Sequence, residues 1–253
     1  MRYLVLSDVH ANLPALEAVI AEAKGRGFDA TIFLGDAVGY YPHAEEAVQR
    51  LIELDPVVRI LGNHDSALLD LAQGDFGDHW AAGIVMNVLE RQLVTLSGDS
   101  LRFLQSLERR HVARGFEAAH GALSHDWEYL STLTTAQANV GLMSEKLLFV
   151  GHTHVPKLFA TTSNGSNDLW RTVSFRDARE TSYRIPPLAR VIANPGAVGQ
   201  PRDQVPLASY FIFDAGAGVI HHHRVDYDLK SVQLDVVAAG YPEMLASRLE
   251  AGR

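Results

Sequence analysis

The sequence predicts an α/β fold that opens as a parallel, doubly wound sheet. Between residues 4 and 61, short apolar segments alternate with amphipathic ones, and this strand–helix order is typical of parallel sheets. The later part of the chain is richer in strand signals. A chain of 253 residues without a linker or a change of composition is long enough for one large core. We therefore expect a single domain over residues 1–253.

The first half shows the clearest alternation. Leu4-Val5-Leu6 is apolar at every position, as expected of a strand that is buried on both faces. Asn12 can cap the helix that follows, because its side chain can accept from free main-chain N–H groups. Strands are expected over residues 4–6, 30–34 and 57–61, and helices over 12–25 and 43–54.

The second half is expected to contain helices and then strands. Apolar residues recur at three- and four-residue spacings over 66–107, which predicts helices there. Residues 169–188 carry four arginines and are expected to be irregular. Further strands are expected over residues 111–113, 116–121, 147–150, 157–162, 191–193, 210–214 and 219–225, and further helices over 135–144, 229–239 and 242–250.

The composition excludes several kinds of site. The chain has no cysteine, and so no disulfide, thiolate metal site or cysteine nucleophile. The formal net charge is −8 and no lysine- or arginine-rich block stands out, which argues against stable nucleic-acid binding. No apolar run approaches the roughly 20 residues that a membrane helix needs, and the N-terminus lacks the apolar core of a signal peptide. A cytoplasmic protein without a membrane partner is expected.

Polar side chains follow five of the expected strands, each beside a glycine or a serine. Open α/β sheets place their sites at the carboxyl ends of strands. The residues are Asp8 and His10; Asp36; Asn63, His64 and Asp65; His120; and His152 and His154. Carboxylate, amide and imidazole groups bind divalent metals, and two ions about 3.5–4 Å apart can clamp the attacking and leaving oxygens of a displacement. The pattern favours a pair of divalent cations.

In their order and spacing, these five segments resemble the motif blocks of the calcineurin-like metallophosphoesterases. The segments are Asp8-x-His10, Gly35-Asp36-x-x-Gly39, Gly62-Asn63-His64-Asp65, His120-Gly121 and Gly151-His152-x-His154. The resemblance extends over about residues 3–214. Residues 194–203 are similar to a small prokaryotic branch of YfcE-like and diadenosine-tetraphosphatase-related proteins, although Ala197 stands where that branch usually has serine.

The resemblance implies a fold and a set of metal ligands. The fold would be a four-layer α/β/β/α sandwich of two mixed sheets, with a dinuclear metal site at the sheet edge. One ion would be held by Asp8, His10, Asp36 and His154, and the other by Asp36, Asn63, His120 and His152. Nitrogen and oxygen ligands admit Mn, Fe, Zn, Co or Ni, and of these Mn is favoured.

The same resemblance implies a mechanism. A hydroxide that bridges the metals would attack phosphorus in line. His64 would bind no metal, face the substrate and protonate the leaving group. Asp65 would hydrogen-bond His64 and fix its tautomer. The expected activity is hydrolysis of phosphate esters, with small phosphodiesters favoured and a small phosphate ester or nucleotide as the partner.

Other functions stay open. A phosphomonoesterase, a dinucleoside-polyphosphate hydrolase and a Ser/Thr-type protein phosphatase would use the same metal pair. A different class is an inactive metal-binding scaffold, as in the retromer subunit that resembles this family. Because His64 and every expected ligand are present, hydrolysis is favoured over the scaffold.

The sequence indicates the residues that contact the substrate less clearly than it indicates the metal ligands. His125, in the loop of residues 122–134, and Arg202, after a Gly-Gln-Pro turn, are the candidates. The arginines of residues 171–190 could grip a second phosphate, although a solvated loop explains them equally well. The run His221-His222-His223 cannot present three ligands together, because successive residues of a strand face opposite sides. A solvated strand is expected there.

Overall fold

The computed structural model of the protein describes residues 1–75, 83–163, 168–176 and 178–253. Its strands are β1 (Arg2–Leu6), β2 (Ala30–Phe33), β3 (Val58–Arg59), β4 (Arg110–Ala113), β5 (Phe116–Ala119), β6 (Leu147–Phe149), β7 (Lys157–Ser163), β8 (Asp168–Ser174), β9 (Glu180–Arg184), β10 (Arg190–Asn194), β11 (Ala208–Asp214) and β12 (Val219–Val225). Its helices are α1 (Leu13–Arg26), α2 (Ala44–Leu54), α3 (Asn63–Ala72), α4 (Ile84–Leu93), α5 (Gly98–Gln105), α6 (Leu133–Val140), α7 (Leu229–Ala238) and α8 (Glu243–Ala251).

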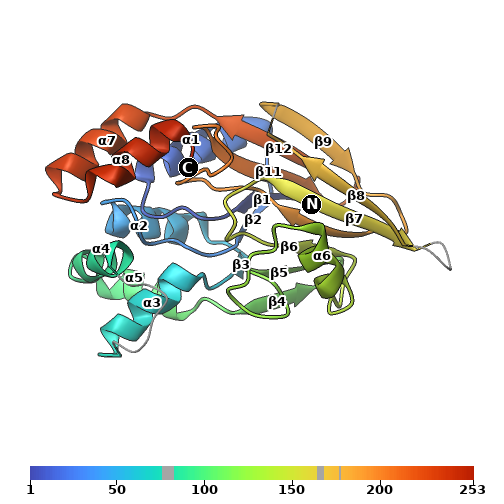
Figure 1. Ribbon diagram of the computed structural model, residues 1–253, viewed down its shortest axis with the longest axis horizontal. Coiled ribbons are helices and arrows are strands. Elements are labelled where there is room, and N and C mark those ends of the chain that lie inside the picture. The colour runs from blue at the N-terminus through green and yellow to red at the C-terminus, as the bar shows by residue number, and fades with distance from the viewer. Residues whose placement is uncertain (76–82, 164–167, 177) are drawn as a thin grey trace.

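These strands form two mixed sheets of six strands each (Figure 1). The first sheet has the order β3-β2-β1-β11-β12-β9, in which β1, β2 and β3 are parallel. The second has the order β4-β5-β6-β10-β7-β8, in which β5, β6 and β10 are parallel. Parallel strands place their carboxyl ends at the same edge of a sheet. The residues that follow β1, β2 and β3 are therefore neighbours, as are those that follow β5 and β6.

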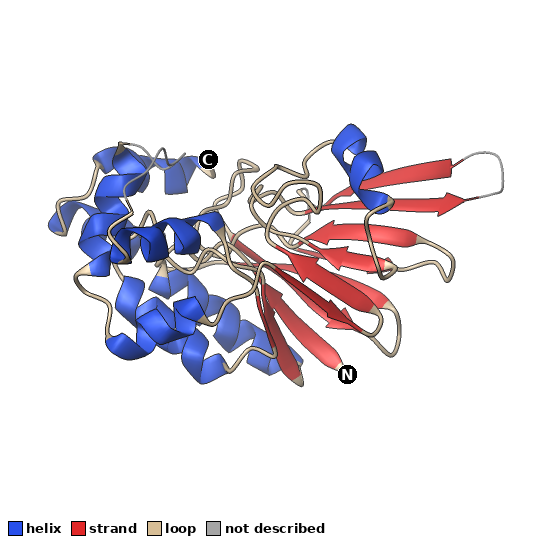
Figure 2. Ribbon diagram, turned by 90° about the horizontal axis from the view of Figure 1, so that it is seen from below, coloured by secondary structure: helices blue, strands red, loops and turns tan. Residues whose placement is uncertain are grey.

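Three apolar cores separate four layers. Leu4 and Leu6 of β1 pack in a core with helices α1–α5, α7 and α8, which mostly gather on one side of the strands (Figure 2). Val5 points the other way and packs between the two sheets with Phe211. Ala136 of α6 packs in a third core against the second sheet. The predicted four-layer α/β/β/α sandwich is confirmed.

Main-chain hydrogen bonds lock the loops at the strand ends. The N–H of Asp8 donates to the carbonyl of Gly35 at 3.0 Å, and the N–H of His10 donates to that of Asp36 at 2.9 Å. The N–H of Gly199 donates to the carbonyl of Asp8 at 2.9 Å. The loops after β1 and β2 are thus held together before any side chain contributes.

Residues 169–188 are not irregular, so that expectation was wrong. β8 pairs antiparallel with β7, and β9 pairs antiparallel with β12. Both β8 and β9 are edge strands of their sheets. Edge strands tolerate charged side chains, and for this reason the arginines of this segment did not indicate the two strands.

The His221-His222-His223 run is largely buried, so the expectation of a solvated strand was wrong as well. β12 lies between β11 and β9 in the first sheet. The His222 ring is stacked 4.9 Å from Phe175, and its Nε2 lies 2.9 Å from the Ser209 hydroxyl. His221 and His223 stack on each other at 6.4 Å, which fits the predicted alternation of faces. The position of a strand within its sheet cannot be seen in the strand's own residues.

The helical region expected over 66–107 contains α3, α4 and α5, while residues 76–82 lie outside the described part. α3 begins at Asn63, so the Gly62-Asn63-His64-Asp65 motif forms a helix start. Within the described residues, every helix is too short or too polar to cross a membrane.

Candidate metal centre

The residues expected to bind metal converge where the strand ends of the two sheets meet. Each of them is at most 7% exposed, and ionisable groups buried to this degree need partners. The first sheet contributes Asp8 and His10 after β1, Asp36 after β2 and Asn63 at the start of α3. The second sheet contributes His120 after β5, and His152 and His154 after β6.

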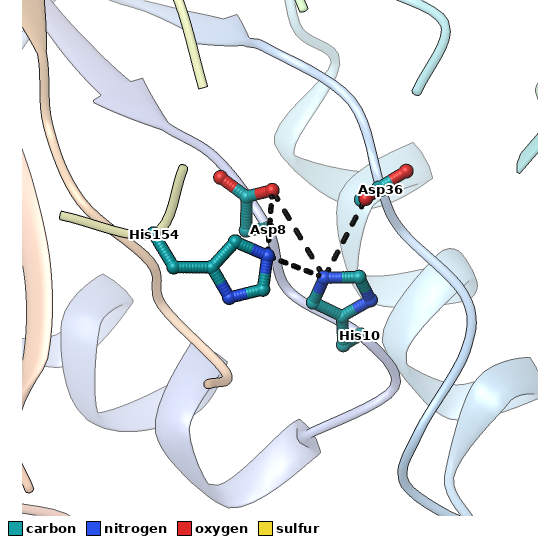
Figure 3. A group of neighbouring side chains, drawn as sticks. All are labelled: Asp8, His10, Asp36 and His154. Carbon is teal, nitrogen blue, oxygen red and sulfur yellow. Dashed lines mark hydrogen bonds and ion pairs between the residues drawn. The ribbon is translucent and has the colours of Figure 1, made fainter. Parts of the chain in front are cut away.

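One group of side chains consists of Asp8, His10, Asp36 and His154 (Figure 3). The Nε2 atom of His10 lies 3.5 Å from Oδ2 of Asp36 and 3.1 Å from Nε2 of His154. The Nε2 atom of His154 lies 3.3 Å from Oδ1 of Asp8. One ligand atom from each residue lies within 4.8 Å of the others, so the four can bind a single ion.

A second group consists of Asp36, His120 and His152. The Nε2 atom of His120 lies 3.3 Å from Oδ2 of Asp36 and 3.1 Å from Oδ1 of Asn63. Asn63 thus stands beside this group, as the resemblance implied. Asp36 belongs to both groups, which is the arrangement expected of a carboxylate that bridges two ions.

Main-chain carbonyls orient all four imidazoles. His10 Nδ1 lies 3.0 Å from the carbonyl of Val38, and His120 Nδ1 lies 2.7 Å from that of Leu34. The two remaining contacts are His154 Nδ1 to the carbonyl of Gln200 at 2.6 Å and His152 Nε2 to the carbonyl of Trp127 at 3.0 Å. A carbonyl only accepts, so each of these nitrogens carries the hydrogen. Metal-binding histidines typically hold their other ring nitrogen in this way.

This orientation provides a test of whether the residues fit a metal. In the neutral rings, the Nε2 atoms of His10 and His154 each carry a lone pair and no hydrogen, and these two atoms lie 3.1 Å apart. Two lone pairs cannot form a hydrogen bond, whereas a cation beside both nitrogens satisfies them. The buried donor set therefore fits divalent metal.

The backbone of the ligand residues is unusual. Asp8, His10, Asp36, His152 and His154 all have positive φ, between 49° and 65°. Positive φ is uncommon outside glycine, and such strained residues cluster at functional sites. The strain gives independent support to a site at this position.

The charges of the pocket suit metal binding. Burial would raise the pKa of Asp8 and of Asp36, but the neighbouring imidazoles hold both below the ordinary value. Burial lowers the pKa of His10, and lowers that of His152 to about 3. At His120 burial is outweighed by Asp36 and Asp8, which raise its pKa to about 9. Ionised carboxylates and mostly neutral imidazoles are the forms that bind metal.

His64 lies beside the cluster but belongs to neither group. Its ring centroid is 4.6 Å from that of His10 and 4.7 Å from that of Tyr40. Its main-chain N–H donates to Oδ1 of Asp36 at 2.9 Å. Burial lowers the pKa of His64 to about 4, although Asp36 opposes the shift.

Asp65 does not hydrogen-bond the His64 ring, which corrects the expectation from the resemblance. Its two oxygens instead accept main-chain N–H groups at 2.8–3.3 Å, from Asp36, Ala37, Val38 and Gly62. A carboxylate in the first turn of a helix turns back toward the free N–H groups there, whereas successive residues point in different directions around the helix. Burial and Asp36 raise the pKa of Asp65 to about 7.

A cavity of about 240 Å³ opens onto the cluster. It is lined by Asp36, Tyr40, Asn63, His64, Trp127, Tyr129, His152, His154 and Arg202. His64 and Arg202 are thus at the cavity, where the sequence interpretation expected them. The aromatic lining was not expected from the sequence.

His125 lies outside this cavity, contrary to its expected contact with substrate. Its side chain is 84% exposed and lies 4.0 Å from Glu128. The same loop turns Trp127 and Tyr129 toward the cavity instead. Aromatic residues at alternate positions after the His120-Gly121 motif were the signal that could have identified them.

Three arginines of residues 171–190, where the sequence allowed a grip on a second phosphate, contact other parts of the protein. Arg176 donates to Oε1 of Gln204 at 2.7 Å, and Arg184 donates to the carbonyl of Ala217 at 2.9 Å. Arg179 forms an exposed ion pair with Asp226. These three do not line the cavity at the metal cluster.

Comparisons with known proteins cover nearly the whole chain. The family model described as the calcineurin-like phosphoesterase superfamily domain matches residues 1–218. The uncharacterized protein MJ0912 of Methanocaldococcus jannaschii is 33% identical over 256 residues, which cover 98% of this chain and 97% of the relative.

Two solved structures are similar over their full extent. A metallophosphoesterase from Sphaerobacter thermophilus is 35% identical with a TM-score of 0.85, and the match covers 100% of both chains. The hypothetical protein PH1004 from Pyrococcus horikoshii has a TM-score of 0.77, covering 100% of this chain and 98% of its own. At 18% identity, that second likeness shows a shared fold.

Proposed function

The chain belongs to the calcineurin-like phosphoesterase superfamily, and from this premise we propose that it is a metal-dependent phosphoesterase that acts on small phosphate esters. The observation that carries the proposal is the pair of buried ligand groups that share Asp36. The facing lone pairs of His10 and His154 add to it, because they need a cation.

We assign one divalent ion to the group of Asp8, His10, Asp36 and His154. The second is assigned to Asp36, Asn63, His120 and His152. When bound, such ions activate water and neutralise charge on phosphate oxygens. Manganese is the preferred candidate among the ions that nitrogen and oxygen ligands admit.

The chain's own residues favour an anionic substrate. The carboxylates of Asp8 and Asp36 carry less negative charge than two divalent ions bring, so the loaded site is positive. Arg202 lines the same cavity and adds a further positive charge. A positive, largely buried site attracts phosphate more strongly than a surface patch does, because water screens it less.

We assign His64 as the residue that protonates the leaving oxygen. Its support is its position, since it lines the cavity but belongs to neither ligand group. A bound phosphate anion favours the protonated ring. Asp65 is assigned a positioning role, because it holds the main chain of Gly62 and of residues 36–38 on either side of the bridging carboxylate.

Within this activity, small phosphodiesters remain the favoured substrate class. A dinucleoside-polyphosphate hydrolase and a protein phosphatase are the alternatives with the same chemistry. An inactive scaffold is disfavoured, because His64 and every expected ligand are present. A cytoplasmic location stays a prediction.

The test is a substrate panel on protein stripped of metal and then reloaded with Mn²⁺. A chromogenic phosphodiester, a chromogenic phosphomonoester, a phosphopeptide and a dinucleoside tetraphosphate would be compared by kcat/KM. Hydrolysis that depends on Mn²⁺ would support the phosphoesterase, and preference for the diester would support the favoured class. Two bound ions without hydrolysis of any ester would instead support the scaffold.

A further inference from the structure

We infer that Tyr40, Arg202 and Tyr129 form an arch across the cavity that grips the substrate phosphate and limits the site to small phosphate esters, so that phosphorylated proteins are excluded. This inference rests on the proposed function and narrows its substrate class. The arch is built from three loops: Tyr40 lies in the loop after β2, Tyr129 in the loop after β5 and Arg202 in the loop after β10. All three side chains line the cavity beside the metal cluster.

The guanidinium of Arg202 joins the two tyrosines. Its Nη2 donates to the hydroxyl of Tyr40 at 3.1 Å, and its Nη1 donates to the hydroxyl of Tyr129 at 3.4 Å. Its Nε and Nη2 also donate to Oε1 of Gln200, at 3.2 and 3.0 Å. The planar guanidinium is thereby fixed between the two rings.

Each end of the arch rests on imidazoles of the cluster. The Tyr129 ring stacks on His152, with centroids 4.2 Å apart and planes 16° apart. The Tyr40 ring lies 4.5 Å from that of His10 and 4.7 Å from that of His64. The arch therefore spans from the first ligand group to the second across the cavity.

The arch has hydrogens to donate to a phosphate. Both tyrosine oxygens accept from Arg202, so their own O–H groups can point to a ligand. Within the described residues, the contacts of Arg202 use four of the five guanidinium hydrogens, and the remaining one is on Nη1. Phosphate oxygens only accept, and hydrogen bonds from arginine to phosphate are among the strongest.

The loop that carries Arg202 is tied to the cluster itself. The N–H of Arg202 donates to the carbonyl of His154 at 3.3 Å, and the carbonyl of Gln200 lies 2.6 Å from His154 Nδ1. The next residue, Asp203, forms a buried ion pair with Arg224. Arg202 is thus held before any ligand arrives, which lowers the entropy lost on binding.

The arch leaves little room. A cavity of about 240 Å³ lies below the roughly 300–1,000 Å³ of typical ligand sites. Such a space holds a phosphate with a small organic group. A phosphorylated side chain on a protein brings flanking main chain, which this cavity would have to admit past Tyr129 and Trp127. The arch therefore argues against the protein-phosphatase alternative.

The first experiment compares kcat/KM of Mn²⁺-loaded enzymes for p-nitrophenyl phosphate, bis(p-nitrophenyl) phosphate and a phosphorylated protein. Tyr129→Phe keeps the ring on His152 and removes only the hydroxyl, whereas Tyr129→Ala removes that end of the arch. Arg179→Ala is the matched control, because its ion pair with Asp226 is exposed and away from the cavity. We expect Tyr129→Ala to lose about tenfold of the preference for the small esters, because the cavity then opens to the main chain that flanks a phosphorylated side chain. Tyr129→Phe should keep the preference and raise KM.

The second experiment measures the affinity of the same proteins for inorganic phosphate by calorimetry, with metal content determined for each. Tyr129→Phe and Arg202→Gln should bind phosphate about tenfold more weakly or worse, and Arg179→Ala should bind it as the wild type does. If no ester is hydrolysed, the proposed function fails, and these affinities alone decide whether the arch grips phosphate. Unchanged phosphate affinity in both arch variants, or an unchanged substrate preference in Tyr129→Ala, would overturn the inference.

Discussion

Replacing Gly62 by alanine tests whether Asp36 lies where both ions need it. Gly62 has a φ of −91°, so alanine adds no backbone strain. Its Cβ would collide with Oδ1 and the main-chain nitrogen of Asp36, and would lie 2.7 Å from Asp36 Cγ. Carbon atoms in contact are separated by at least about 3.5 Å, so the carboxylate must move by roughly 0.8 Å.

The expected cost follows from this displacement. Overpacking of a buried site costs about 1–3 kcal/mol, and each kcal/mol lowers the Tm of a chain of this size by about 2–4 °C. The metal-free variant should therefore melt about 2–12 °C below the wild type. A displaced bridging carboxylate should also weaken Mn²⁺ binding by about 10–100-fold, the range seen when supports of ligands are lost. Circular dichroism and calorimetry measure the two effects.

Gly25→Ala is the matched control for this experiment. A Cβ at Gly25, within α1, would meet nothing within 4 Å. Alanine stabilises such helical positions by about 0.4–1 kcal/mol, so the Tm should hold or rise and Mn²⁺ affinity should not change. Wild-type Mn²⁺ affinity in Gly62→Ala would refute the reasoning that Asp36 bridges the two ions.

Three further predictions follow from particular side chains. Burial and the nearby Arg224 lower the pKa of His222 from 6.5 to about 3. Between these two pH values the imidazole is protonated in the unfolded chain and neutral in the folded chain. The stability that this residue contributes is complete above pH 6.5 and falls by up to about 1.4 kcal/mol per pH unit toward pH 3. In His222→Phe the urea concentration at the unfolding midpoint should therefore depend less on pH between pH 6.5 and 4.5. An equal pH dependence of that midpoint in the wild type and the variant would contradict the prediction. His64→Ala should keep its metal content and lose about 10²–10⁴-fold in turnover on esters with poor leaving groups, so unchanged turnover on such esters would remove His64 as the acid. A chelator should lower the Tm of the metal-loaded protein by several degrees, because ions at about 100 times Kd stabilise the folded state by about 2.7 kcal/mol each, and an unchanged Tm would contradict metal binding to the folded chain.

The sequence was most informative about the strands and the residues at their ends. Parallel strands bring their carboxyl ends together by geometry alone, so the positions of Asp8, Asp36 and His152 followed from local motifs. The four-layer fold followed from the family resemblance. The metal groups combine residues from both sheets, and it was the family resemblance that predicted which of these residues come together.

What the sequence missed depends on the partners of each segment in the folded chain. β8 and β9 are strands because β7 and β12 lie beside them, and their own residues are too polar to show it. Asp65 turned out to accept hydrogen bonds from the main chain of residues 36–38 and of Gly62, a role that depends on the direction of its side chain in α3. Trp127 and Tyr129 line the cavity because their loop folds over it, and the alternation of aromatic residues after His120-Gly121 was the one local sign of this. Local patterns therefore identified the candidate ligands, whereas tertiary contacts decided the role of Asp65 and the lining of the cavity.

The existence of a two-ion centre built around Asp36 is tested most directly by counting ions. Metal-free protein would be titrated with Mn²⁺ by calorimetry, and the metal content of the loaded protein measured by mass spectrometry. The wild type should bind two ions per chain, His154→Ala should bind one, and Asp36→Asn should bind neither tightly. A wild type that takes up no divalent ion, or an Asp36→Asn variant that still binds two, would contradict the shared buried centre.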